Sequence, residues 1–219
     1  LGSVPSDPIS WIVYSTQENE IIASGELANA QDLSSLSERA GQRPITALVP
    51  TSDVLLKWVS LPAKAGRKAL AAIPYMLEDE ISSDINEQFF ALGPKKGNKQ
   101  AVAIVSREKL QSWLLCIEQA GLTCDKLIPD VLALPQARQG WALVELSGQL
   151  LIRQDQWNGL QGEKSWLVQA INHYAKQQTD PLNLENYSGE ELAELSHVDL
   201  EKMPLELPMK VLAIGAGNV

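Results

Sequence analysis

The sequence predicts a mixed α/β fold made of two related halves with an inserted subdomain between them. A hairpin, a helix and a strand follow one another in the amino-terminal part, and the same order is expected again in the carboxyl-terminal part. A further hairpin and two helical segments separate these units, with no low-complexity linker and no exact repeat. With 219 residues, 45% of them hydrophobic and 21% charged, the chain can build a core without disulfides or metal.

The first unit is expected to begin with a hairpin. Apolar residues dominate segments 9–15 and 20–27, and a short polar turn separates them. A helix is expected over residues 30–40, because Asn29 can cap its start and Gly41 can end it.

Two strands and a long helix are expected next. The apolar run at 45–49 lies between two prolines and is typical of an interior strand, and residues 54–61 form the following strand. A helix is predicted over 63–82, with a kink at Pro74, because proline removes a backbone donor and clashes with the preceding turn. Its apolar face comprises Ala69, Leu70, Ile73, Met76, Leu77 and Ile81.

A second hairpin and a second helix complete the insertion. Strands are expected at 89–92 and 101–105, around a loop rich in lysine and glycine. Ser106 can cap a helix over 107–120, and Gly121 can end it. The predicted inner stripe of this helix is Leu110, Trp113, Leu114 and Ile117.

The second hairpin–helix–strand repeat follows a short strand expected at 126–128. After that strand, Asp130 is expected to cap a helical turn. A third hairpin is predicted from strands at 141–146 and 149–154, which meet at a Ser-Gly turn. A helix over 166–177 is expected to point three residues inward, namely Leu167, Ile171 and Tyr174.

The carboxyl-terminal segment is polar and acidic. We expect a short helix at 190–195 and a final strand at 210–214. The chain has a net charge of −9, and residues 111–219 carry most of it, with 7 bases against 14 acids. Residues 180–206 hold eight acids and one base, Lys202. Such a surface attracts a basic partner and disfavours nucleic acid, since phosphate binding needs clustered Lys and Arg.

The sequence contains no familiar catalytic or metal-binding pattern. The two histidines lie in no zinc-binding or hydrolase motif, and Cys116 and Cys124 are expected to be buried, reduced structural thiols. The acids at 78–80 are consecutive, so they splay around a solvated helix end. Gly215-x-Gly217 matches only part of a dinucleotide-binding turn. No catalytic residue, cofactor or metal is therefore expected.

No targeting signal is expected at the beginning of the chain. It starts Leu1-Gly2-Ser3 without methionine, which we interpret as a cloning remnant. No signal peptide and no apolar run of about 20 residues, the length that spans a bilayer, is predicted.

A family resemblance rests on three stretches of sequence. They read LLKWVSLPAKAGRKALAAIPYMLEDEISSDINEQFFALG, VAIVSREKLQSWLLCIEQAGL and IPDVLALP. Together they resemble the cytoplasmic domain of the type II secretion system protein L, a component of the inner-membrane platform. The match is good over residues 54–135 and loose at the flanks.

The resemblance implies an actin-like ATPase-type fold of two RNase-H-like halves with an inserted subdomain and mixed sheets. On that basis residues 1–53, completed by 124–138, form the first half. Residues 54–123 form the insertion, and residues 139–219 form the second half.

Actin-like ATPases place an acid-and-glycine turn in the first hairpin of each half, where the glycine approaches phosphate and the acid holds metal. Here the first turn, Ser15 to Asn19, has neither Asp nor Gly, and the second, Glu145 to Gly148, keeps one glycine and one carboxylate. The resemblance therefore implies a non-catalytic adaptor and not an enzyme.

The family also implies partners and a location. Protein L resembles an adaptor that recruits the cytoplasmic secretion ATPase, protein E, through the ATPase's N-terminal domain. It meets protein M through membrane and periplasmic parts that lie outside this chain, and pairing of two copies is also expected. The parent protein is expected to be single-pass, with this domain on the cytoplasmic face of the bacterial inner membrane.

The docking surface for the ATPase is placed by charge and not by any motif. Our hypothesis assigns it to Glu190, Glu191, Glu194 and Asp199, facing basic residues of the partner. Two alternatives stay open from the sequence: an active actin-like nucleotide-binding ATPase or kinase, and an adaptor like the pilus-assembly protein M.

Overall fold

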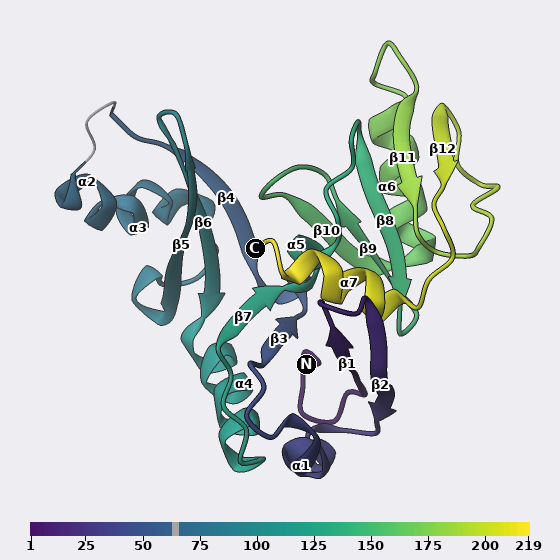
Figure 1. The fold of residues 1–219 in the computed structure, drawn as a ribbon. Helices are drawn as coiled ribbons and strands as arrows, with labels where there is room; N and C mark the ends of the chain where they lie inside the picture. Colours follow the sequence, from purple (N-terminus) through teal and green to yellow (C-terminus); the bar gives the residue numbers. More distant parts are fainter. Residues whose placement is uncertain (63–65) are drawn as a thin grey trace. The chain divides into compact units, whose positions relative to one another are not determined.

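The computed structural model describes residues 1–62 and 66–219, which form two compact units. Unit 1 comprises Leu1–Ser52 and Cys116–Val219, and unit 2 comprises Asp53–Leu115. Figure 1 shows the elements of both units. The finer division into two RNase-H-like halves and an insertion stays a prediction.

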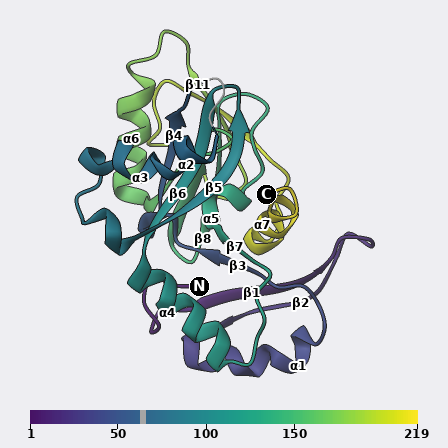
Figure 2. The same ribbon diagram turned by 90° about the vertical axis from the view of Figure 1, so that its left-hand side faces the viewer.

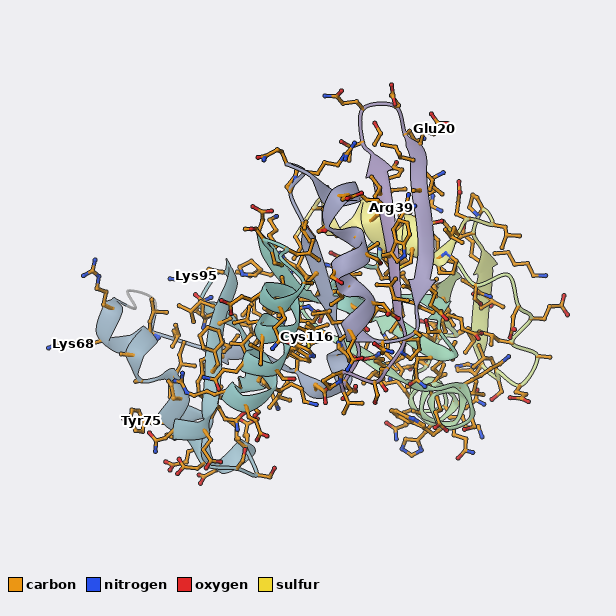
Figure 3. All side chains as sticks on the ribbon, turned by 90° about the horizontal axis from the view of Figure 1, so that it is seen from below. Glu20, Arg39, Lys68, Tyr75, Lys95 and Cys116 are labelled. Atoms are coloured by element: carbon orange, nitrogen blue, oxygen red, sulfur yellow. The ribbon has the colours of Figure 1, made fainter. Side chains whose placement is uncertain are left out.

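Unit 1 begins with the predicted hairpin. Strands β1 (Ile9–Ser15) and β2 (Glu20–Leu27) pair antiparallel, and Figure 2 shows them as a long ribbon. Asn19 adopts a left-handed backbone conformation (φ 54°) in the turn, which asparagine tolerates better than most residues. The guanidinium of Arg39 lies 5.5 Å from the centre of the Trp11 ring, and Figure 3 shows Arg39 beside this hairpin.

The helical segment after the hairpin is mostly a 3-10 helix, which is more tightly wound than the predicted α-helix. A 3-10 helix, η1 (Ala30–Leu36), runs into a single α-helical turn, α1 (Ser37–Ala40). Both predicted ends are confirmed, because the Asn29 side chain accepts a hydrogen bond from the Gln31 N–H and Gly41 has a φ of 53°. Serine hydroxyls in this segment bond to carbonyls three residues back and compete with regular α-helical bonding.

The predicted strand near residue 45 forms, but not in the interior of a sheet. Strand β3 (Thr46–Val49) pairs in parallel with β7 (Lys126–Pro129), and the two make a two-stranded sheet within the described residues. Within this strand Val49 is buried, whereas Ala47 and Leu48 are only half-buried. A 3-10 turn, η2 (Thr51–Asp53), follows β3, and the short helix α5 (Asp130–Ala133) follows β7.

Unit 1 also contains a five-stranded mixed sheet with strand order β10-β9-β8-β11-β12. Its strands are β8 (Trp141–Leu146), β9 (Gln149–Arg153), β10 (Gly159–Glu163), β11 (Leu182–Asn186) and β12 (Val198–Lys202). The β8–β9 hairpin was predicted, and its Ser147 and Gly148 both have positive φ, as a tight two-residue turn requires. The strands β10, β11 and β12 were not predicted.

Helix α6 (Lys164–Ala175) covers one face of this sheet, as Figure 1 shows. The core beneath it is apolar and joins the helix to strands β8, β9 and β11, and partly buried residues of β10 and β12 pack against it. Its most buried members are Leu143, Leu150, Ile152, Leu167, Ile171, Ala175 and Leu184. The inward prediction is confirmed for Leu167 and Ile171. It is wrong for Tyr174, which is 38% exposed and lies against the Trp141 ring at the margin of the core.

The opposite face of β8, β9 and β10 is covered by α5 and by α7 (Pro208–Ala216). The strand predicted at 210–214 is therefore wrong. Pro208 occupies the first turn of the helix, where its missing N–H costs nothing, and Val211, Leu212 and Gly215 recur at helical spacing on the buried side. A Cβ on Gly215 would lie 1.9 Å from the Ala133 carbonyl oxygen, so glycine permits α7 to approach α5.

The helix predicted at 190–195 does not form. This segment connects β11 to β12 without regular structure. Leu192 is 5% exposed and packs with Leu195 into the core beneath α6, so the apolar residues here anchor a loop.

Unit 2 is built on an antiparallel three-stranded sheet of order β4-β6-β5. Its strands are β4 (Leu55–Ser60), β5 (Gln88–Lys96) and β6 (Lys99–Ser106), and the predicted strand and hairpin are confirmed. One face packs on a helical segment through Val59, Ile73, Leu77, Val102 and Ile104.

A single kinked helix was predicted over residues 63–82. Residues 63–65 lie outside the described part of the chain, and over residues 66–82 the prediction is wrong. The chain forms α2 (Arg67–Ala71), α3 (Ile73–Met76) and the 3-10 turn η3 (Glu78–Glu80), followed by η4 (Ile85–Glu87). Pro74 does not kink a continuous helix, because it sits in the first turn of α3. On the predicted apolar face Ile73 and Leu77 are buried, but Met76 is 48% exposed. Figure 3 shows the neighbouring Tyr75 on α3, and it is 71% exposed.

Helix α4 (Arg107–Gln119) matches the prediction closely. The Ser106 hydroxyl accepts a hydrogen bond from the Lys109 N–H at 3.4 Å, and Gly121 has a φ of 69°. Trp113 and Ile117 are buried as expected, but Leu114 is 47% exposed, so the stripe is narrower than predicted.

Candidate docking surface

The acidic residues of the carboxyl-terminal part gather around strands β11 and β12. These strands run parallel in the register Asn183↔Asp199 and Glu185↔Glu201. Because side chains alternate along a strand, these four residues share one face of the sheet, opposite the face that α6 covers. We call this face, together with the β11–β12 connection and the exposed edge of β12, the β12 surface.

A cavity of about 440 Å³ opens on this face. The helices α5 and α7 cover the same side of the sheet over β8, β9 and β10, and the cavity lies beside β11 and β12. Its lining is rich in carboxylates and amides: Arg138, Gln139, Asn183, Leu184, Glu185, Asp199 and Glu201. Three carboxylates against one guanidinium give the cavity a negative character.

Glu185 is one of the residues that line the cavity, and it is 5% exposed. Its carboxylate accepts a hydrogen bond from the Arg138 backbone N–H at 3.0 Å, and the Arg138 Nε lies 3.6 Å away. The Tyr187 hydroxyl donates to the other carboxylate oxygen at 3.4 Å. Burial, and then the nearby Glu185 charge, raise the pKa of Tyr187 above its ordinary value, so its hydroxyl stays a donor at neutral pH.

Arg138 joins the two strands across the cavity. Besides contacting Glu185, its guanidinium donates to the Glu201 carboxylate at 3.0 Å, although the Arg138 side chain is 76% exposed. Gly140, with a φ of 72°, lets this segment approach β11, because a Cβ there would lie 2.0 Å from the Asn183 carbonyl oxygen.

All four predicted docking residues lie on the β12 surface and are exposed. Glu190 pairs with Lys164 at 2.6 Å and Glu191 pairs with Lys202 at 3.1 Å. The hydrogen bond that the Lys164 ammonium donates to the Glu190 carboxylate is the main reason that the pKa of Lys164 is raised. Two of the four charges are thus compensated within the chain, which the sequence did not reveal.

The other two predicted acids keep their charges available. The backbone carbonyl of Glu194 accepts a hydrogen bond from the Asn172 side-chain amide at 2.9 Å. Within residues 1–62 and 66–219 no ion pair involves the Glu194 or Asp199 carboxylate. The sequence reasoning missed Glu185 and Glu201, although both lie in the acidic stretch, and it gave no signal for Arg138.

The two hairpin turns that carry acid and glycine in actin-like ATPases are small and polar here. In the first, the Ser15 hydroxyl accepts from the Glu18 N–H at 3.3 Å, and the Tyr14 hydroxyl bonds to Asn19. In the second, Ser147 lies with its hydroxyl 3.2 Å from that of Ser10 on β1. Neither turn combines an aspartate with a glycine.

Other candidate chemistry is equally sparse. Cys116 and Cys124 are half-buried, so the prediction that both thiols are buried is wrong. The Gly215-x-Gly217 pattern falls in the last turn of α7 and at its carboxyl end, not in a turn between a strand and a helix. No three His, Cys, Asp or Glu side chains group to hold a metal ion in the described ranges. None of the helices seen there has the length and apolar character to cross a bilayer.

One buried carboxylate does not belong to the β12 surface. Asp130 was expected to cap a helical turn, but it is the first residue of α5 and its carboxylate faces Thr51. Its Oδ1 accepts from the Thr51 N–H at 3.1 Å and from the Thr51 hydroxyl at 2.7 Å. Burial raises the pKa of Asp130 to about 6, although the Thr51 hydrogen bonds act in the opposite direction.

Comparison with known proteins identifies the family. The model of the family "Type II secretion system (T2SS), protein L" matches residues 1–218. The chain belongs to the type II secretion system protein L family. This result decides against the pilus-assembly protein M alternative and confirms the resemblance seen in the sequence.

Curated protein L sequences from several bacteria are similar to the chain. The protein from Dickeya chrysanthemi is 32% identical over 169 residues, 76% of this chain and 41% of the relative. The Vibrio cholerae serotype O1 protein is also 32% identical, over 76% of this chain and 41% of the relative. The Klebsiella pneumoniae protein is 38% identical, over 64% of this chain and 35% of the relative. This member of the family thus spans about two fifths of the length of these relatives.

Solved structures support the same conclusion and define the fold. The cytoplasmic domain of EpsL, an inner-membrane component of the type II secretion system of Vibrio cholerae, superposes with a TM-score of 0.86. It is 28% identical, and the match covers 100% of this chain and 93% of that one. The PilM–PilN type IV pilus biogenesis complex matches with a TM-score of 0.61, and the match covers 98% of this chain and 95% of that one. The sequence identity is 14%, so this similarity shows the fold alone. The predicted actin-like ATPase-type fold is confirmed.

Proposed function

We propose that this protein L chain is a non-catalytic adaptor of the secretion machine's inner-membrane platform. It recruits the cytoplasmic secretion ATPase, protein E, by binding the ATPase's N-terminal domain. The observation that carries the proposal is the family match over residues 1–218. The similarity to the cytoplasmic domain of an inner-membrane component supports a position on the cytoplasmic face of that membrane.

The hairpin turns support an adaptor that does not hydrolyse nucleotide. An actin-like ATPase needs an acid to hold metal and a glycine to let backbone approach phosphate. The first turn has neither, and the second has Glu145 and Gly148 only. Equilibrium dialysis with labelled ATP and magnesium tests this point, and we expect no retained nucleotide. Saturable, magnesium-dependent retention with release of phosphate would restore the ATPase alternative.

The docking surface that we propose contains Glu190, Glu191, Glu194 and Asp199. Basic residues on the ATPase domain would approach an exposed acidic surface faster and in a preferred orientation. Further partners of the full-length protein are protein M, met through membrane and periplasmic parts, and a second copy of protein L. The parent protein is proposed to cross the membrane once.

Charge reversal tests the surface. Changing all four acids to lysine should abolish co-purification with the ATPase's N-terminal domain at moderate salt. A matched variant reverses four other exposed acids (Glu18, Glu20, Glu78 and Asp79), so that both variants have the same net charge. Exposed ion pairs contribute little to stability, so both variants should fold, which thermal unfolding checks. Equal retention of the ATPase domain by the two variants would reject the acidic surface.

A further inference from the structure

We draw no further inference here: the strongest candidate, the surface patch of exposed basic residues on α2 and the β5–β6 hairpin of unit 2 (Arg67, Lys68, Lys95, Lys96 and Lys99), carries nothing because no feature of the structure shows what covers it.

Discussion

Asp130 offers a quantitative test of the packing between β3, β7 and α5. Its carboxyl group is 6% exposed, and its pKa is raised from 3.8 to about 6 by burial. A raised pKa means that the folded state binds the proton more tightly than the unfolded chain does. The stabilisation is therefore complete below about pH 4 and is lost as the pH rises through about 6.

The size of the effect follows from the shift. Two pKa units correspond to about 3 kcal/mol, since one unit is about 1.4 kcal/mol. Asp130→Asn keeps an oxygen for the Thr51 N–H and hydroxyl but cannot ionise. Between pH 4 and pH 7.5, the free energy of unfolding of this variant should therefore rise relative to that of the unaltered chain by about 3 kcal/mol.

Urea unfolding at several pH values measures this difference directly, and carbon-13 NMR of the Asp130 carboxyl follows its titration. Thr51→Val provides a second, directional check. It removes the hydroxyl that bonds to the carboxylate and should move the midpoint of the titration above 6. A midpoint near 4, or an Asn variant whose unfolding follows the pH profile of the unaltered chain, would refute the reasoning.

Three further predictions concern packing and the cavity. Gly215→Ala should destabilise the chain by about 2–4 kcal/mol in urea unfolding because its Cβ meets the Ala133 carbonyl, whereas Gly217→Ala, at the residue that caps the carboxyl end of the same helix, should be neutral or slightly stabilising. Leu151→Ala, at a fully buried position on β9, should lower the free energy of unfolding by about 2–5 kcal/mol, and an unchanged denaturation midpoint would contradict the assigned burial. Gly140→Ala should lower the melting temperature, because it combines a positive φ with a clash against Asn183, and unaltered melting would show that this segment can move away from β11.

The parts of the fold that the sequence predicted are those with strong local signals. The β1–β2 and β8–β9 hairpins follow from apolar runs around polar or Ser-Gly turns, and α4 follows from its cap and its glycine end. The strand expected at 210–214 failed because a short apolar run does not distinguish a strand from a buried helix. Pro208 was the available cue for a helix start.

The parts that could not be predicted depend on tertiary contacts. Strands β11 and β12 carry many polar residues, and their pairing is visible only once the parallel register with β8 exists. A short helix was expected at 190–195, but Leu192 in this segment anchors a loop in the core beneath α6. For the candidate site, the acids were predicted from charge, whereas the Lys164 and Lys202 ion pairs and the Arg138 contact depend on folding.

The most direct test of the adaptor proposal is calorimetric titration of this chain with the N-terminal domain of the secretion ATPase at moderate salt. We predict a saturable complex of defined stoichiometry that the four lysine substitutions at Glu190, Glu191, Glu194 and Asp199 abolish. The matched charge variant should bind like the unaltered chain. Absence of binding by the folded, unaltered chain would contradict the proposed function.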